Sequence, residues 1–145
     1  MARIRGKDTS PEREIGKRLV ALGFKFECHP KDIPGRPDIL FRRAKVAIFI
    51  DGDFWHGWRF PLWKKKLSEK WAQKIESNRL RDRKNMRLLR RLEWRVVRIW
   101  EHQVEQDASK CLERVTRVLE STGVAPRRPR LANTRVNREK CVQDA

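Results

Sequence analysis

One short segment constrains the fold more than any other part of the chain. Val46 to Ile50 reads VAIFI, an unbroken run of apolar residues. A strand with one face in water alternates apolar and polar side chains, whereas a strand that is buried on both faces reads as a continuous apolar run. The segment therefore predicts a central, doubly covered strand, and the rest of the chain must supply a layer on each face.

A first helix is predicted near the N-terminal end. Residues 9–12 read TSPE, which fits a capping box with a proline in the first turn. Apolar residues then recur at helical spacing at Ile15, Leu19 and Leu22. Gly23 is a natural stop, because glycine readily adopts the conformation that ends a helix.

The other elements are predicted from apolar periodicity and turn residues. In order, they are a short extended piece at 24–28, a hairpin of strands at 38–41 and 44–50, a charged helix from about 61 or 65 to 92, a strand at 95–100 and a helix at 104–119. This order predicts an α/β fold with a mixed central sheet flanked by helices. The length of 145 residues predicts one domain, at 1–122, and the proline-containing basic segment 123–145 is expected to be a flexible tail.

The chain is strongly basic, with 36 Lys and Arg against 19 Asp and Glu and a formal net charge of +17. Such an excess attracts polyanions, and counterion release from duplex DNA or RNA would supply much of the affinity. The alternatives are a basic protein that is merely soluble and one that coats acidic membranes.

Three features predict the compartment. No apolar run approaches the roughly 20 residues needed to cross a bilayer, and the N-terminal sequence MARIRGKDTS lacks the apolar stretch of a signal peptide. Cys28, Cys111 and Cys141 are far apart and form no CxxC pair, so no disulfide framework is expected. We therefore expect a cytoplasmic protein of the bacterial cytosol or nucleoid that has no membrane partner.

Two aspartates mark the ends of the predicted hairpin. If the hairpin turns about Ala44-Lys45, Asp38 and Asp51 lie directly opposite each other with Cβ atoms ~5 Å apart. Two carboxylates that close repel unless a cation lies between them, and Mg²⁺ prefers such oxygen ligands. A slip of one residue would place them on opposite faces, and aspartates are common at turns, so a structural role stays open.

Two further side chains could complete such a site. His56 lies in the loop DGDFWHGW just after Asp51, and an imidazole near a metal-bound phosphate can activate water as a general base. Glu12 could reach the same end of the sheet from the first helix. Each has a structural alternative, because loop histidines are often hydrogen-bonded surface groups and the glutamate of a capping box already has a partner.

Aromatic and basic residues suggest how a duplex could be held. Phe54, Trp55 and Trp58 share one short loop with a polar base, and DNA-bending proteins use such side chains as wedges between base steps. Core packing is the alternative. The segment 64–91 carries twelve Lys or Arg and three acids, which favours phosphate contacts over a merely solvated helix face.

Five separated motifs carry a resemblance to a known family: IRGKDTSPE, IPGRPDIL, IFIDGDFWHG, WAQKIESNRLRDRKN and LEWRVVRIWE. In this order and spacing, over about residues 3–102, they resemble the Vsr very-short-patch-repair endonucleases. The resemblance implies a restriction-endonuclease-like core of the PD-(D/E)xK group. It also implies a Mg²⁺-dependent enzyme that nicks one strand of duplex DNA beside a T:G mismatch.

The resemblance also assigns roles residue by residue. Asp38 matches the family's metal-binding aspartate, His56 matches its general-base histidine, and Glu12 matches the glutamate that the first helix contributes. Three positions match the aromatic residues that intercalate at the mismatch: Phe54, Trp55 and Trp71.

Three departures from the family pattern bear on specificity. The family usually has histidine where this chain has Asp51, and Asp53 stands where the wider group has its lysine. Of the family's structural zinc ligands, this chain keeps an acid and a histidine, so we expect no zinc, since two ligands cannot close a tetrahedral site. The four positions are Asp82, His102, Trp58 and Phe60. We also expect the family's N-terminal DNA-gripping arm to be missing.

These observations predict a Mg²⁺-dependent phosphodiesterase that acts as a monomer on double-stranded DNA. Asp38 and Asp51 would hold the metal, His56 would activate water, and Glu12 would orient the metal-bound water or His56. The alternatives are a nuclease of the same fold with a homing, restriction or defence target, and a non-catalytic DNA-binding module. The expected DNA-backbone contacts are Arg36, Lys64, Lys65, Lys66, Lys74, Arg79 and Arg83.

Overall fold

The central strand predicted from the VAIFI segment is β3, Val46–Asp51, and all its residues are buried. The computed structural model, which describes residues 10–126, places it between β2, Ile39–Phe41, and β4, Arg95–Trp100. The two-residue β1, Glu27–Cys28, extends the sheet beyond β2. The β1–β2 and β2–β3 pairs are antiparallel and the β3–β4 pair is parallel. The predicted mixed sheet is therefore confirmed.

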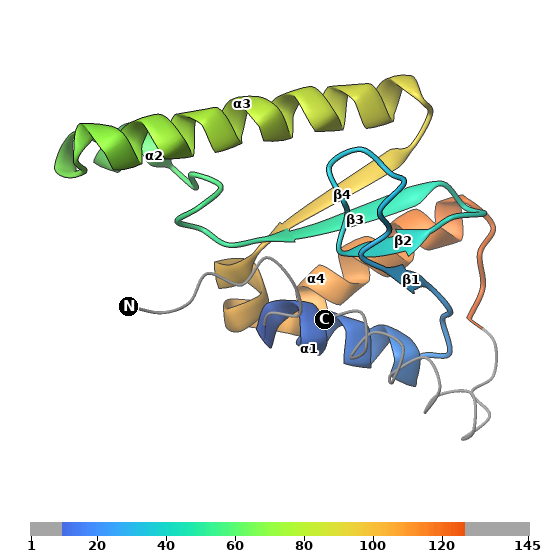
Figure 1. The fold of residues 1–145 in the computed structure, drawn as a ribbon. Coiled ribbons are helices and arrows are strands. Elements are labelled where there is room, and N and C mark those ends of the chain that lie inside the picture. Colours follow the sequence, from blue (N-terminus) through green and yellow to red (C-terminus); the bar gives the residue numbers. More distant parts are fainter. Residues whose placement is uncertain (1–9, 127–145) are drawn as a thin grey trace.

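Helices cover both faces of this sheet (Figure 1). On one face lie α1, Ser10–Ala21, and α4, Glu101–Ser121. The long helix α3, Glu69–Arg91, lies across the other face. The arrangement confirms the predicted α/β fold with helical layers on both sides and is consistent with a restriction-endonuclease-like core.

The two hydrophobic cores follow the alternation of side chains along β3. Ile48 and Ile50 pack with Ile15 and Leu19 of α1 and with residues of α4. Leu22, which was predicted to continue the α1 stripe, is instead 43% exposed because the helix ends at Ala21 and Gly23 turns the chain with φ 90°.

The opposite face of the sheet forms a smaller core. Ala47 and Phe49 of β3 pack with Leu40 of β2 and with Met86 and Leu89 of α3. A strand that contributes buried side chains to both cores cannot carry polar residues at alternate positions, which explains why the VAIFI segment is uniformly apolar.

The predicted single helix after residue 60 is divided into three pieces. A short helix, α2, spans Phe60–Trp63, a 3₁₀ turn, η1, spans Lys64–Lys66, and α3 follows. The break lies at Leu67 and Ser68, which are extended. The Ser68 side chain accepts a hydrogen bond from the backbone of Trp71 and so caps α3.

The register of the hairpin differs from the prediction. Ile39 pairs with Ile48, whereas a turn about Ala44-Lys45 would pair it with Ile50. The turn is therefore centred one residue earlier, and Asp38 and Asp51 lie at the same end of the sheet without facing each other directly. A displacement of two partners keeps the inward and outward faces unchanged, so both cores still form.

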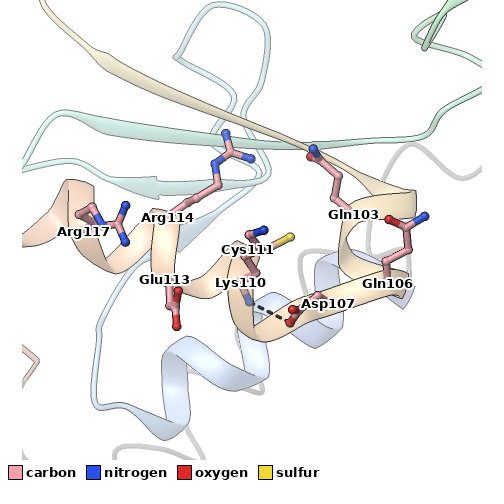
Figure 2. A pocket seen from close by; sticks show the side chains of 8 residues that line it. All are labelled: Gln103, Gln106, Asp107, Lys110, Cys111, Glu113, Arg114 and Arg117. Carbon is pink, nitrogen blue, oxygen red and sulfur yellow. Dashed lines mark hydrogen bonds between the residues drawn. The ribbon is translucent and has the colours of Figure 1, made fainter.

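The last helix begins earlier than predicted and is kinked. α4 starts at Glu101, directly after β4, and Asp107 inside it has non-helical angles of φ −158° and ψ 87°. The Asp107 carboxylate accepts a hydrogen bond from the backbone nitrogen of Lys110 at 3.1 Å (Figure 2). Asp107 thus acts as an N-cap within the helix and begins a second segment.

Three expectations concern other parts of the chain. Cys28 is disulfide-bonded, a bond that the expectation of no disulfide framework did not foresee, while Cys111 is a buried free thiol. Across residues 10–126, none of the helices combines the length and the apolar character needed to span a bilayer. The proposed flexible tail lies outside the described residues from position 127 onward.

Candidate active site

Three ionisable side chains meet where β1 ends and β2 begins. Glu12 comes from the first turn of α1, His29 follows β1, and Asp38 precedes β2. Because β1 and β2 are antiparallel, His29 and Asp38 are neighbours, and the backbone nitrogen of His29 donates to the Asp38 carbonyl at 3.1 Å. His29 Nε2 lies 3.0 Å from Glu12 Oε2 and 3.6 Å from Asp38 Oδ1.

This group has the composition of a cation site. One potential ligand atom from each residue lies within 4.8 Å of the others, and among residues 10–126 this is the one group of three or more such residues. All three side chains are almost fully buried. The group has two carboxylates and only one imidazole, so a bound cation would balance the negative charge of its ionised carboxylates. Hydrogen bonds to Asp38 and Glu12 raise the pKa of His29 to about 9.

One atom of the group lacks a partner. His29 Nδ1 is buried, and within the described part of the chain it is the one such side-chain nitrogen or oxygen without a hydrogen bond. Buried polar atoms are normally paired, so this corner of the fold is not optimised for stability alone. Carboxylate oxygens suit Mg²⁺, and an imidazole nitrogen is a more usual ligand for transition metals. The residues present therefore fit a divalent cation.

Asp38 is held in place from the central strand. Its Oδ2 accepts a hydrogen bond from the backbone nitrogen of Ile50 at 2.6 Å, which leaves Oδ1 toward His29. Burial raises the pKa of Asp38 to about 7, against the opposing effect of the hydrogen bond to His29. A carboxylate that is costly to ionise in isolation is one that a bound cation would stabilise strongly.

A second ionisable group lies at the carboxyl end of β3. Asp51, the last residue of β3, accepts a hydrogen bond from Arg98 Nε of β4 at 2.7 Å. His56 Nδ1 lies 2.6 Å from Asp82 Oδ2 on α3, and Arg98 Nη2 donates to the same oxygen at 3.1 Å. His56 Nε2 lies 3.5 Å from Asp51 Oδ1.

The charges of this group act on the imidazole in opposite directions. Burial lowers the pKa of His56, but the hydrogen bond to Asp82 and the charges of Asp51 and Asp82 outweigh it, so the pKa is raised from its ordinary value of 6.5. Burial raises the pKa of Asp51, against the nearby positive charges of His56 and Arg98. The imidazole thus lies in a negative environment that favours accepting a proton.

The structure thus divides the four predicted catalytic residues between two adjacent groups. Glu12 and Asp38 belong to the first group, while Asp51 and His56 belong to the second. The groups are close enough for the charge of Asp51 to act on Asp38. The direct Asp38–Asp51 pair that the sequence predicted is replaced by two separate sets of partners.

Three residues of these groups were not anticipated as part of the site: His29, Arg98 and Asp82, the last of which was considered only as a zinc-ligand position. His29 lies directly after a strand of two residues, and its pairing with Asp38 could be predicted only if β1 had been paired with β2. Arg98 is one of many basic residues, and only its place in β4, two residues before the partner of Asp51, distinguishes it.

The aromatic residues after Asp51 form a cluster at the start of α3. Phe54, 40% exposed, contacts Trp55, Trp63 and Trp71 with ring centroids 4.9, 5.6 and 6.4 Å away. Trp55 and Trp71 are also in contact, at 5.3 Å. We call Phe54, Trp55, Trp63 and Trp71 the aromatic cluster. Trp63 was not predicted, and Trp58 packs elsewhere, against Trp100 and His102.

Of the predicted DNA-backbone residues, one contacts the aromatic cluster directly. Lys74 Nζ lies 5.7 Å from the centre of the Trp55 ring. Arg79 is partly buried. Its side chain packs so closely against Gly57 that a Cβ atom at position 57 would lie 2.5 Å from the Arg79 Cδ. The remaining predicted contacts are exposed: Arg36, Lys64, Lys65, Lys66 and Arg83.

The four residues that the resemblance matches to the family's zinc ligands contact other side chains. Phe60 is fully buried against Ala72 and Ile75, and the Trp58 ring packs at 4.6 Å from the ring of His102. His102 Nδ1 pairs with Asp53 Oδ1 at 2.7 Å, while Asp82 binds His56 and Arg98.

We therefore expect the purified protein to contain no stoichiometric zinc. An indole and a phenyl ring cannot ligate the ion, and a structural site needs four ligands. Elemental analysis of protein prepared without chelators tests this expectation. A full equivalent of zinc per chain would contradict it and would require ligands not identified here.

A separate depression of about 390 Å³ runs along α4 (Figure 2). Side chains on both sides of the Asp107 kink line it, among them Gln103, Lys110 and Arg114. None of its lining residues belongs to either ionisable group, so this depression is not part of the candidate site.

Comparison with known proteins shows which sequences this chain is similar to. The family described as DNA mismatch endonuclease Vsr matches residues 1–61. The type II nicking enzyme V.XorIIP of Xanthomonas oryzae pv. oryzae is 38% identical over 103 residues, which cover 70% of this chain and 76% of that enzyme. V.NmeDIP of Neisseria meningitidis serogroup C is 36% identical over 114 residues, covering 77% of each chain. The DNA mismatch endonuclease Vsr of Escherichia coli K12 is 35% identical over 103 residues, covering 70% of this chain and 66% of that enzyme. On this evidence the chain belongs to the Vsr family of endonucleases.

Proposed function

We propose that the protein is a Mg²⁺-dependent endonuclease that nicks one strand of duplex DNA at a T:G mismatch. One observation carries the proposal: a buried carboxylate–imidazole group that fits a divalent cation lies beside a second imidazole held by a carboxylate. The names of the relatives, which include a DNA mismatch endonuclease and several nicking enzymes, support the choice of substrate. We further propose that the protein acts as a monomer on DNA in the bacterial cytosol or nucleoid.

In this proposal each group has a distinct task. Asp38 and Glu12 hold the cation, and His29, hydrogen-bonded to Glu12 at 3.0 Å, either ligates it or orients that carboxylate. When bound, the cation polarises the phosphate and stabilises the leaving oxygen. His56 removes a proton from the attacking water through Nε2. The expectation that Asp51 is a second ligand is not retained, because Arg98 binds it at 2.7 Å.

The aromatic cluster and the basic helix would hold the substrate. Phe54, Trp55 and Trp71 lie in and beside the loop that follows Asp51, so they flank the candidate site. Inserting them into the stack costs a few kcal/mol for each step that is unstacked, and the cost is lowest at a mismatch or a flexible step. The exposed basic residues predicted to contact the DNA backbone would bind phosphates.

Nicking assays test the proposal most directly. Matched duplexes and duplexes with a single T:G pair would be incubated with Mg²⁺, Mn²⁺, Ca²⁺ or EDTA. We expect a single-strand nick at the T:G pair with Mg²⁺ and no product with EDTA. Cleavage of matched DNA at the same rate would favour a nuclease of the same fold with another target. Tight binding without any metal-dependent cleavage would indicate a DNA-binding module.

Replacing Trp55 by alanine is expected to reduce cleavage and to remove the preference for the mismatch. Trp55 is half-buried, and its ring contacts Phe54 and Trp71 of the aromatic cluster and the ammonium group of Lys74. The loss of stability should therefore be well below the ~3–5 kcal/mol typical of a truncated core tryptophan. Cleavage rates and thermal denaturation of the variant measure the two effects separately.

Trp94→Ala is a matched control for this variant. Trp94 is also half-buried, but it packs against the core between the sheet and α3. This control should lose thermal stability while its folded fraction keeps the preference for mismatched DNA. If Trp55→Ala behaved in the same way, Trp55 would be a structural residue rather than a wedge.

A further inference from the structure

Four side chains from separate elements form one closed network around His56. Asp51 ends β3, Arg98 lies in β4, Asp82 lies in α3, and His56 lies in the loop between β3 and α2. The Asp82 Oδ2 atom binds both His56 Nδ1, at 2.6 Å, and Arg98 Nη2, at 3.1 Å. Arg98 Nε binds Asp51 Oδ2 at 2.7 Å, and Asp51 Oδ1 lies 3.5 Å from His56 Nε2.

The network fixes which nitrogen of His56 carries the hydrogen. An ionised carboxylate can only accept hydrogen bonds, so the contact with Asp82 requires a hydrogen on Nδ1. In the neutral ring Nε2 then carries the lone pair. The orientation of the ring and the identity of its basic nitrogen are therefore set by Asp82, which lies on the helix opposite the sheet.

Arg98 binds the carboxylates of Asp51 and Asp82 at the same time. A guanidinium presents several donors in a rigid planar fork, and here two of them reach carboxylates from β3 and α3. The Arg98 guanidinium also lies 4.3 Å from the centre of the Trp100 ring, in a cation–π contact. On the far side, the Arg98 carbonyl accepts a hydrogen bond from Arg114 of α4 at 3.2 Å.

The same contacts determine what Asp51 can do. Arg98 supplies a fixed positive charge at Asp51 and Asp82, so these carboxylates can lie around one imidazole without a metal ion between them. Asp51 therefore interacts with Arg98 and His56. It does not belong to the group of Glu12, His29 and Asp38.

We propose that Asp82 and Arg98, the latter anchored on Asp51, are positioning residues that hold His56 in the reactive tautomer. The inference rests on the proposed function in that it assigns a purpose to the basic nitrogen of His56. It differs from that function because it concerns the internal geometry of the network, which can be observed whether or not the protein cuts DNA.

The first experiment compares Arg98→Gln with Arg95→Gln. Both arginines lie in β4, but Arg95 is exposed and binds Ser121 at 2.6 Å, away from His56. Single-turnover nicking at saturating DNA and metal should fall by about 10–100-fold in Arg98→Gln, as for other residues that orient a reactive group, with an unchanged DNA dissociation constant. Arg95→Gln should keep the parent rate. An Arg98→Gln protein that nicks at the parent rate would overturn the proposal.

Conservative variants separate positioning from simple charge. Arg98→Lys keeps the charge but cannot span two carboxylates with one ammonium nitrogen, so it should remain impaired. Adding guanidinium ion to Arg98→Ala should recover part of the rate, whereas adding methylammonium should not. Full activity of Arg98→Lys would show that charge alone suffices and would reject the positioning role.

Nitrogen-15 NMR of the three histidines provides a readout that needs neither cleavage nor a destabilised variant. In the parent at a pH where the ring is neutral, His56 should carry its hydrogen on Nδ1, and Asp82→Asn should shift the ring toward the other tautomer. The His56→Gln spectrum assigns the signal. A parent His56 with its hydrogen on Nε2 would overturn the inference. If His56 shows the expected tautomer but the protein cuts no DNA, the proposed function is rejected and the role of the network is still supported.

Discussion

Replacing Asp38 by asparagine is expected to abolish metal-dependent nicking while leaving DNA binding largely intact. The carboxylate is buried beside Glu12 and His29, and its Oδ1 faces His29 within the group that would hold the cation. Asparagine has the same shape and keeps an oxygen that can accept the hydrogen bond from Ile50, so the fold should be preserved. It lacks the negative charge that a hard cation requires.

Three measurements on this variant separate the explanations. Nicking of a T:G duplex with Mg²⁺ reports the chemistry, binding to the same duplex with Ca²⁺ reports recognition, and calorimetry with Mn²⁺ reports the cation site. Asp32→Asn is the matched control, because Asp32 lies in the same loop region but is exposed and paired with Arg42. An active Asp38→Asn protein would disprove the proposed cation site.

Replacing His56 by alanine is expected to lower the single-turnover rate by about 10²–10⁴-fold, the usual effect of losing a general base. The imidazole is half-buried and has carboxylates on both sides, so no other side chain of the network can take over its role. In the parent, the rate should rise with pH and level off above 6.5, because the network raises the pKa of His56 above that value. The variant should lose this dependence.

His102→Ala is a close control for that variant. His102 has nearly the same exposure as His56, 24% against 28%, and it also binds a carboxylate through Nδ1, at 2.7 Å from Asp53. Its contacts, with Asp53 and with the ring of Trp58, involve no residue of either ionisable group, so the rate should be retained. Equal losses in the two variants would indicate that both histidines support the loop rather than the chemistry.

Much of the fold could be predicted because burial leaves a direct record in the sequence. The VAIFI segment identified β3, since a strand between two cores must be apolar at every position. The break before α3 was missed because Lys64 to Lys66 and Lys70 continue one charged pattern, and only Ser68 marks a new helix. The hairpin register was missed because Lys45 adopts a positive φ of 56°, which nothing about a lysine predicts.

The site was only partly predictable for a similar reason. Glu12, Asp38 and His56 were predicted from their places at the ends of the expected elements and from motifs that resemble a family. The contacts of Asp51 with Arg98, and of Asp82 with His56, join residues that are 47 and 26 positions apart. A contact of that kind depends on the pairing of β3 with β4 and on the placement of α3, and neither can be deduced from the spacing of the residues.

The stacking within the aromatic cluster has a consequence for discrimination between DNA sites. Phe54 lies nearly parallel to Trp63, with an interplanar angle of 19°, so in the free protein one face of the proposed wedge is already covered by another ring. Insertion into DNA would exchange this internal stack for a stack on bases. The free energy of the internal stack then sets a threshold: a base step that is well paired and well stacked does not open for the exchange, whereas a mismatched step opens at lower cost. In this view Trp63 acts as a competitor that every base step must displace, and selectivity would depend on a contact that is broken in the complex.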